Sequence, residues 1–231
     1  MTQEAMRSSI ERIRRELAEA SEGRYPAPRL MAVTKTHTAA EILPLREMGI
    51  TEIGENRVQE LEGKLPELGD AFRIHLIGRL QRNKVKQVIR DVSMIQSVDS
   101  LPLAEEISRR ALEAGLRMDV LTEISPAGEE QKGGVPREET EAFLRSIAPL
   151  EGIRVKGLMA VMPFTDDEGY LDRLFAETRQ LFERIRDTAI PGIEMEELSM
   201  GMSGDYRLAA RHGATVVRVG SAIFGPRETH N

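Results

Sequence analysis

Eight short apolar runs alternate with amphipathic helical stretches along the chain, and this alternation constrains the fold more than any other feature. The runs predict strands at residues 30–34, 51–53, 72–77, 94–98, 118–123, 153–160, 197–199 and 215–219. Strands that alternate with helices are typical of a parallel sheet covered by helices. Eight units of about 24 residues each favour a closed (β/α)8 barrel, a TIM barrel in the α/β class. A doubly wound open sheet is the alternative, because both folds bury parallel strands on both faces.

The helical stretches support the same architecture. Ile10, Ile13 and Leu17 recur at steps of three and four, which predicts an amphipathic helix ahead of the first strand. The clearest helices between strands are expected at 101–114 and 169–187. With no low-complexity linker, we expect a single domain over the whole chain, 1–231.

Composition excludes several classes of partner. A net charge of -6 gives no broad attraction for nucleic acid, and the four histidines lack the spacing of zinc ligands. The absence of cysteine fits a reducing compartment. The N-terminus has no apolar signal region, and no stretch is apolar over a membrane's width. We therefore expect a cytoplasmic protein without a metal, nucleic-acid or membrane partner.

Lys35 is the first candidate for chemistry because it follows the first predicted strand. Functional groups of such barrels stand where the strands end. If Met31 and Val33 point into the barrel, strand alternation also directs Lys35 inward. Partial burial lowers the pKa of an amine, and a neutral amine can attack an aldehyde to form a Schiff base. An ordinary solvated loop lysine is the alternative.

Two strand-to-helix junctions near the C-terminus are rich in glycine and serine, in LSMGMSGDY and VRVGSAIFG. Such junctions let backbone N–H groups approach an anion, and helices that begin near Ser203 and Ser221 would add favourable dipoles. A phosphate site after the last two strands is common in these barrels. The alternative is that the glycines only permit tight turns.

Arg218 lies two residues before Gly220 in the last predicted strand, so both face inward. A buried arginine needs an acceptor, and a pyridine nitrogen or a phosphate oxygen would serve. An ion pair with Glu52, Glu55 or Glu123 is the structural alternative.

Polar residues after the second and third predicted strands are candidates to line the mouth of the barrel. They are Asn56, His75, Gln81 and Asn83. A lone histidine in an apolar strand is more often a core residue, so His75 has this second interpretation. The nearby basic residues are expected to be a solvated rim.

The chain closely resembles the pyridoxal-phosphate homeostasis proteins of the YggS or PROSC type over nearly its whole length. Seven segments carry the resemblance in that family's order: AVTKTHTAAEI, GENRVQE, HLIGRLQRNK, IQSVDS, GLMAVMPF, LSMGMSGDY and VRVGSAIFG. It implies the barrel of the alanine racemase N-terminal domain, known as fold type III among proteins that bind pyridoxal 5'-phosphate (PLP). It also implies that Lys35 carries PLP as a Schiff base.

The resemblance further assigns the residues around the cofactor. It implies that Asn56 lies near the ring and that Arg218 faces the ring nitrogen. The implied phosphate site and its floor comprise Ser203, Gly220 and Ser221, with Ser199, Met200 and Gly201 beneath. One departure is Ile74, where many members have tryptophan before the histidine of the third strand.

A carrier rather than an enzyme is the favoured interpretation. Arginine can only donate, so Arg218 would keep the ring nitrogen neutral and weaken the cofactor as an electron sink. We also expect no counterpart of the C-terminal β-domain of the racemases, and none of Tyr25, Tyr170 and Tyr206 is an obvious base. We expect a monomeric PLP-binding protein that passes PLP to PLP-dependent apoenzymes. A weak amino-acid racemase or other α-carbon enzyme is the alternative, and a cofactor-free lyase that uses Lys35 is a third possibility.

Overall fold

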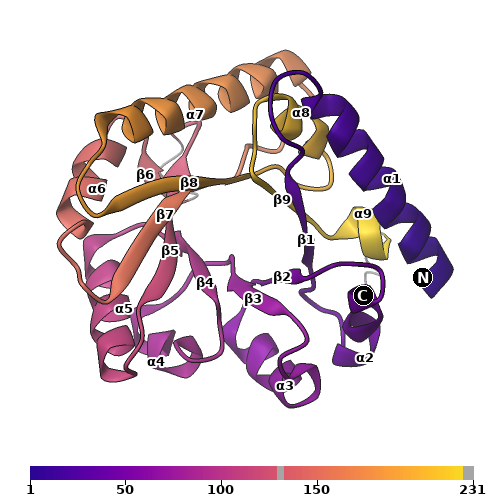
Figure 1. Cartoon of the computed structure of the whole chain (residues 1–231), viewed down its shortest axis with the longest axis horizontal. Coiled ribbons are helices and arrows are strands. Elements are labelled where there is room, and N and C mark those ends of the chain that lie inside the picture. Colours follow the sequence, from indigo (N-terminus) through magenta and orange to yellow (C-terminus); the bar gives the residue numbers. More distant parts are fainter. Residues whose placement is uncertain (129–132, 226–231) are drawn as a thin grey trace.

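Eight parallel strands close into a barrel in the computed structural model, which describes residues 1–128 and 133–225 (Figure 1). The strands are β1 (Arg29–Val33), β2 (Glu52–Glu55), β3 (Arg73–Leu76), β4 (Met94–Val98), β5 (Met118–Ser125), β7 (Ile153–Ala160), β8 (Ile193–Met200) and β9 (Val216–Val219). β1 pairs with both β2 and β9, and β4 pairs with β5, so the ring has no open edge. The predicted barrel is confirmed, and the open sheet is wrong.

The predicted strands agree with the structure to within two residues at each end, except at β8, and one further strand was not predicted. β8 begins at Ile193, four residues before the predicted start. Its first half contains Glu194 and Glu196, so it lacks the apolar run from which the strand was predicted. Both glutamates form ion pairs with Lys156 of β7. A further strand, β6 (Val135–Pro136), pairs with the end of β5 and was not predicted, because two residues carry no periodicity.

Helices surround the barrel on the outside (Figure 1). They are α1 (Gln3–Ser21), α2 (Ala39–Ile42), α3 (Val58–Leu68), α4 (Val85–Val88), α5 (Leu101–Glu113), α6 (Thr140–Ile147), α7 (Glu168–Thr188), α8 (Tyr206–Arg211) and α9 (Ser221–Phe224), with 3-10 turns at Leu43–Arg46 and Arg82–Lys84. The helices predicted at 101–114 and 169–187 are therefore confirmed within one residue at each end. The predicted first helix is α1, which buries Ile10, Ile13 and Leu17 and packs against α8 and α9.

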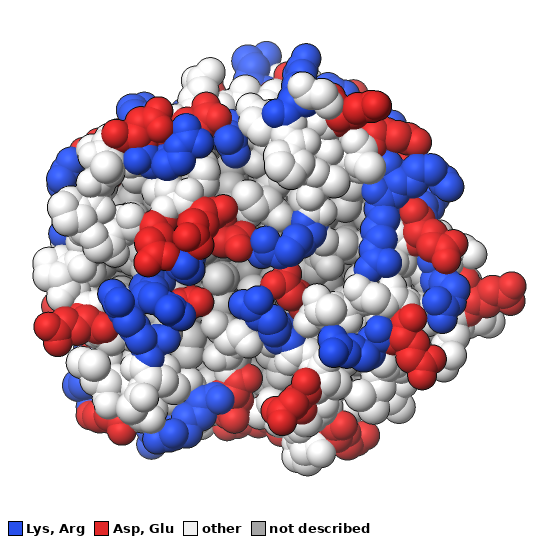
Figure 2. Space-filling model, in the orientation of Figure 1, with Lys and Arg blue, Asp and Glu red and all other residues white. Residues whose placement is uncertain are grey.

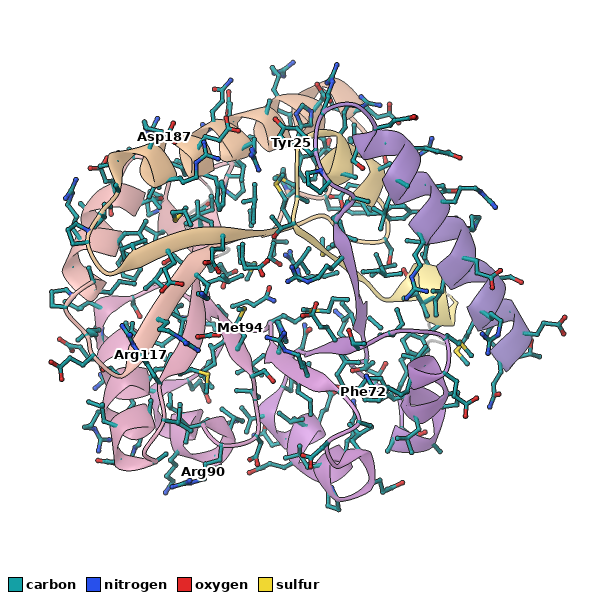
Figure 3. The ribbon with its side chains drawn as sticks, viewed as in Figure 1. Tyr25, Phe72, Arg90, Met94, Arg117 and Asp187 are labelled. Carbon is teal, nitrogen blue, oxygen red and sulfur yellow. The ribbon has the colours of Figure 1, made fainter. Side chains whose placement is uncertain are left out.

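Strand residues divide between two environments. Side chains that face the helices form the main apolar core, whereas those that face inward fill the ring (Figure 3). A small apolar cluster of Met94, Leu121 and Met159 lies apart from the main core. Where the strands begin, Arg29 bridges Glu52 at 3.2 Å and Glu197 at 2.8 Å. On the face shown in Figure 2, acidic and basic side chains are interleaved, and this face has no large patch of a single charge.

Gly157 in β7 predicts a large effect on stability. Its φ is +147°, and an added Cβ would lie 1.9 Å from the carbonyl oxygen of Glu197, at a shift in the register between β7 and β8. Gly157→Ala should lower the free energy of unfolding in urea by at least about 2 kcal/mol. Gly63 in α3 is the matched control, because nothing lies within 4 Å of its added Cβ. Gly63→Ala should stabilise by about 0.5 to 1 kcal/mol. Equal stability of both variants would contradict this account.

Candidate functional site

A cavity of about 270 Å³ opens beside the ends of β1, β8 and β9. Five residues that the sequence singled out line it together: Lys35, Ser203, Arg218, Gly220 and Ser221. They meet because β9 pairs with β1 on one side and with β8 on the other. The structure thus brings residues from distant segments into one site.

Lys35 lies two residues beyond the end of β1 and is half-buried. Met31 is fully buried, and Val33 lines the same cavity as Lys35. The predicted alternation along this strand therefore directs Lys35 to the inner side of the barrel mouth. It does not stand on the solvated outer surface.

Arg218 brings a buried positive charge to the cavity. Its side chain donates from Nη1 to Ser199 Oγ at 2.7 Å and from Nη2 to the carbonyl oxygen of Ala160 at 2.8 Å. Burial lowers its pKa to about 10, while nearby Asp205 and Glu123 act in the opposite direction, so the group stays cationic at neutral pH. A guanidinium has five N–H donors, so donors remain for a ligand in the cavity.

The predicted alternative for Arg218, a structural ion pair, is not found. Among the described residues, no carboxylate lies within 4 Å of its guanidinium nitrogens. Glu52 pairs with Arg29, and Glu55 pairs with Lys64. Arg218 is therefore a buried cation whose carboxylate neighbours act only from a distance.

The loop after β8 forms the other wall of the cavity. Ser203 Oγ accepts N–H bonds from Gly220 at 3.2 Å and from Ala222 at 3.3 Å, so its hydroxyl proton is available to a ligand. Gly201 allows this loop to leave the strand: its φ is +93°, and an added Cβ would lie 2.4 Å from Ala209 Cβ. The arrangement presents hydroxyl and backbone donors that suit an anion.

The predicted start of one of the two helices near the cavity is wrong. α8 begins at Tyr206 rather than near Ser203, and Asp205 occupies the position before it. The Asp205 carboxylate accepts the N–H of Met202 at 2.5 Å, and burial raises its pKa. An acidic side chain therefore already accepts a hydrogen bond in this turn. The second predicted helix start is confirmed, because α9 begins at Ser221, which lines the cavity.

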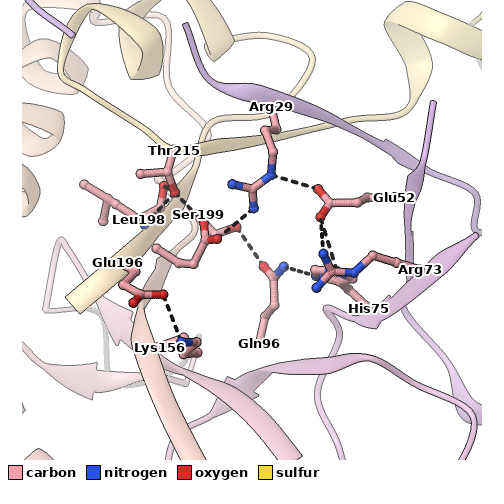
Figure 4. Close-up of polar contacts among 11 residues, drawn as sticks. Arg29, Glu52, Arg73, His75, Gln96, Lys156, Glu196, Leu198, Ser199 and Thr215 are labelled. Atoms are coloured by element: carbon pink, nitrogen blue, oxygen red, sulfur yellow. Dashed lines mark hydrogen bonds and ion pairs between the residues drawn. The ribbon is translucent and has the colours of Figure 1, made fainter. Parts of the chain in front are cut away.

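A chain of hydrogen bonds connects Arg218 with the middle of the barrel. Ser199 donates to Gln96 Oε1 at 2.7 Å, and Gln96 Nε2 lies 2.9 Å from His75 Nδ1 (Figure 4). Because an arginine only donates, the Ser199 hydroxyl oxygen accepts from Arg218, and the hydroxyl O–H donates to Gln96. The Gln96 amide then donates to His75 Nδ1, which leaves the imidazole proton on Nε2, 3.9 Å from Glu52 Oε1.

Five predicted site residues do not line the cavity: Asn56, His75, Ser199, Met200 and Gly201. Ser199 contacts it only through Arg218, and Gly201 lies in the turn after β8. His75 is buried inside the barrel and reaches Arg218 only through Gln96 and Ser199. Met200 belongs to the main core on the helix side, because its neighbour Ser199 faces inward. Asn56 lines a larger neighbouring opening of about 1080 Å³.

Sequence reasoning missed Gln96 in this region and considered Glu123 only as a possible ion-pair partner of Arg218. Gln96 carries the hydrogen-bond chain, and its signal was a glutamine two residues from Met94 within an apolar strand. Glu123 lines an adjacent cavity of about 260 Å³. Burial and the nearby Asp99 together raise its pKa to about 7, against the opposing effects of Arg218 and Arg79. Its position at the inner end of β5 was visible in the sequence, but its environment was not.

The ranges 1–128 and 133–225 contain no group of three or more His, Asp or Glu side chains that could hold a metal ion. Within the same ranges, no helix combines the length and the apolar character needed to span a bilayer.

The environment of His75 predicts a pH-dependent stability. Burial, with Arg73 and Arg29 nearby, lowers its pKa from 6.5 to about 3. Between these values the unfolded chain binds a proton that the folded chain does not, so stability falls as the pH decreases below 6.5, by up to about 1.4 kcal/mol per unit. We expect the difference in unfolding free energy between the wild type and His75→Asn to shrink by about 3 kcal/mol from pH 7 to pH 4. Chemical denaturation at each pH measures it, and a constant difference would contradict the assignment.

Comparison with known proteins identifies the family. Residues 4–228 match the family described as "Alanine racemase, N-terminal domain". The pyridoxal phosphate homeostasis protein of Aquifex aeolicus is 36% identical over 220 residues, covering 95% of each chain. That of Deinococcus radiodurans is 41% identical over 209 residues, covering 90% of this chain and 94% of its own.

Solved structures agree with these relatives. An unknown protein from Bifidobacterium adolescentis superposes with a TM-score of 0.91 at 37% identity, covering 96% of this chain and 95% of that one. PipY of Synechococcus elongatus, solved with PLP bound, has a TM-score of 0.81 at 34% identity, and the match covers 92% of this chain and 100% of that one. An alanine racemase of Clostridium difficile, at 17% identity and a TM-score of 0.75, shares the fold over 98% of this chain and 57% of its own. The chain therefore belongs to the family of pyridoxal phosphate homeostasis proteins, built on the alanine racemase N-terminal domain.

Proposed function

We propose that this protein binds PLP as a Schiff base on Lys35 and maintains the cellular supply of PLP rather than acting as an enzyme. The observation that carries the proposal is the 270 Å³ cavity, which joins an amine, a buried guanidinium and an anion-binding loop. These are the three groups that an aldehyde, a pyridine nitrogen and a phosphate need. Transfer to PLP-dependent apoenzymes, a cytoplasmic location and a monomeric state remain predictions.

Each part of the cavity suits one part of the cofactor. The hydroxyl groups of Ser203 and Ser221, with the backbone N–H of Ser221, would hold the phosphate. Arg218 would donate to the ring nitrogen, and Lys35 would supply the amine. When bound, PLP contributes an aldehyde that condenses with amines and a ring that withdraws electrons. Because Arg218 donates a hydrogen bond without giving up its proton, it favours retention over catalysis.

The tyrosines support the carrier interpretation. Tyr206 donates to Glu16 at 2.5 Å, outside the barrel. Tyr25 lies beneath the guanidinium of Arg179, and Tyr170 lies beside that of Arg173. None of the three lines the Lys35 cavity in the described part of the chain, so a tyrosine base like that of the racemases has no counterpart among them.

The second candidate is a weak racemase or another α-carbon enzyme, and Glu123 favours it. A carboxyl group with a pKa of about 7 can exchange protons at neutral pH. To separate the two functions, the PLP-loaded protein should be incubated with single-enantiomer amino acids. We expect chirality to be lost no faster than with free PLP at the same concentration. Sustained turnover that Glu123→Gln abolishes would establish the enzyme instead.

The role of Lys35 has a direct spectroscopic test. Lys35→Ala should remove the visible imine absorption that forms on addition of PLP, with the far-ultraviolet circular dichroism unchanged. Lys84→Ala is the control, because Lys84 lines the larger opening and not this cavity. A band that survives in Lys35→Ala would assign the Schiff base to another amine. A wild-type protein that stays colourless with PLP would leave the cofactor-free lyase as the better interpretation.

A further inference from the structure

The residue before Lys35 is held by a buried ion pair on the outer side of the barrel. Thr34 is fully buried, and its hydroxyl donates to Glu55 Oε1 at 2.5 Å. Its carbonyl oxygen accepts from Lys64 Nζ at 2.9 Å, and Lys64 also contacts Glu55 Oε1 at 2.7 Å. Its N–H donates to the carbonyl oxygen of Gly54 at 3.1 Å. The polar groups of Thr34 are therefore all fixed.

The residue after Lys35 is held in a conformation that threonine rarely adopts. Thr36 has a φ of +69°, in the left-handed region, which is an outlier for a β-branched residue. Its N–H donates to Glu60 Oε2 at 2.9 Å. The N–H of His37 closes the turn on the carbonyl oxygen of Thr34 at 3.2 Å, and the His37 ring stacks on Phe224 with centroids 4.0 Å apart. The turn is thus constrained on both sides of the lysine.

Stability alone does not explain the ion pair. The side chain of Glu55 is fully buried and that of Lys64 is 10% exposed, so both charges lose hydration. Apolar residues in place of a buried pair are often neutral or stabilising. Glu55 Oε2 also lacks a hydrogen-bond partner among the described residues. Neither residue lines the cavity, because their side chains lie on the helix side of the sheet.

We infer that Glu55, Glu60 and Lys64 are positioning residues, which fix the turn around Lys35 so that its amine stays over the cavity. The inference rests on the proposed function, in which Lys35 binds PLP. It also gives the segment GENRVQE a role: its two glutamates reach the residues on either side of Lys35, and Lys64 follows one helical turn later. A looser turn would spread the amine over more positions, so the Schiff base would form more slowly and be retained less well.

The decisive variant replaces the whole buried pair. Glu55→Leu combined with Lys64→Met leaves no buried charge but removes the acceptor of the Thr34 hydroxyl, so it should lower the thermal midpoint less than Lys64→Met alone. The apparent Kd for PLP should rise about tenfold, and the imine band should form more slowly. Lys64→Met alone should lower the midpoint, because it leaves a buried carboxylate unpaired. The control is Glu141→Gln with Arg145→Met, which removes a 2.8 Å surface pair on α6 and should leave PLP binding unchanged. A stable double variant with wild-type Kd and rate would overturn the inference.

Glu60 provides a second test that does not disturb the core. Glu60→Leu removes the acceptor for the Thr36 N–H and should slow imine formation several-fold. Glu60→Gln retains an acceptor oxygen and should restore most of the rate. Equal rates for wild type, Glu60→Leu and Glu60→Gln would contradict the inference even if the double variant fails to fold. A wild-type protein that forms no imine on Lys35 would instead contradict the proposed function.

Discussion

The structure depends on how a closed barrel accommodates the permanent cation of Arg218. Two neutral acceptors, Ser199 and the carbonyl oxygen of Ala160, contact the guanidinium, and burial lowers its pKa without neutralising it. Ser199 can accept from Arg218 only because Gln96 takes its proton, and Gln96 in turn needs an acceptor at His75 (Figure 4). Each hydrogen bond in this chain thus determines which atom of the next group must donate.

This chain explains why His75 is kept neutral. A protonated imidazole would present an N–H at Nδ1 and remove the acceptor that Gln96 needs. Burial disfavours the charged ring for a second reason, and Arg29 and Arg73, on the side of Glu52, add repulsion. The barrel interior therefore holds Arg218 in one orientation, in which it lines the cavity beside Lys35. Since Arg218 can only donate to a ring nitrogen, this arrangement supports the proposal of a PLP carrier over that of an enzyme.

Strand periodicity and alternation predicted the barrel and the inward-facing residues Lys35 and Arg218. The same alternation places Met200 on the helix side, since its neighbour Ser199 faces inward. The resemblance to the family had instead implied that Met200 lies beneath the phosphate site. Gln96 was missed because its partner Ser199 lies 103 positions away, and such contacts across a barrel leave no local pattern. The start of α8 was misplaced because Asp205, rather than Ser203, satisfies the preceding turn.

The central claim is that the amine of Lys35 bonds covalently to PLP within this cavity. Reduction of the PLP-loaded protein with borohydride, followed by proteolysis and peptide mass mapping, tests it most directly. We predict one modified peptide, with the phosphopyridoxyl mass added at Lys35 and lost when Lys35 is replaced. An adduct confined to other lysines, or no adduct at all, would contradict the account.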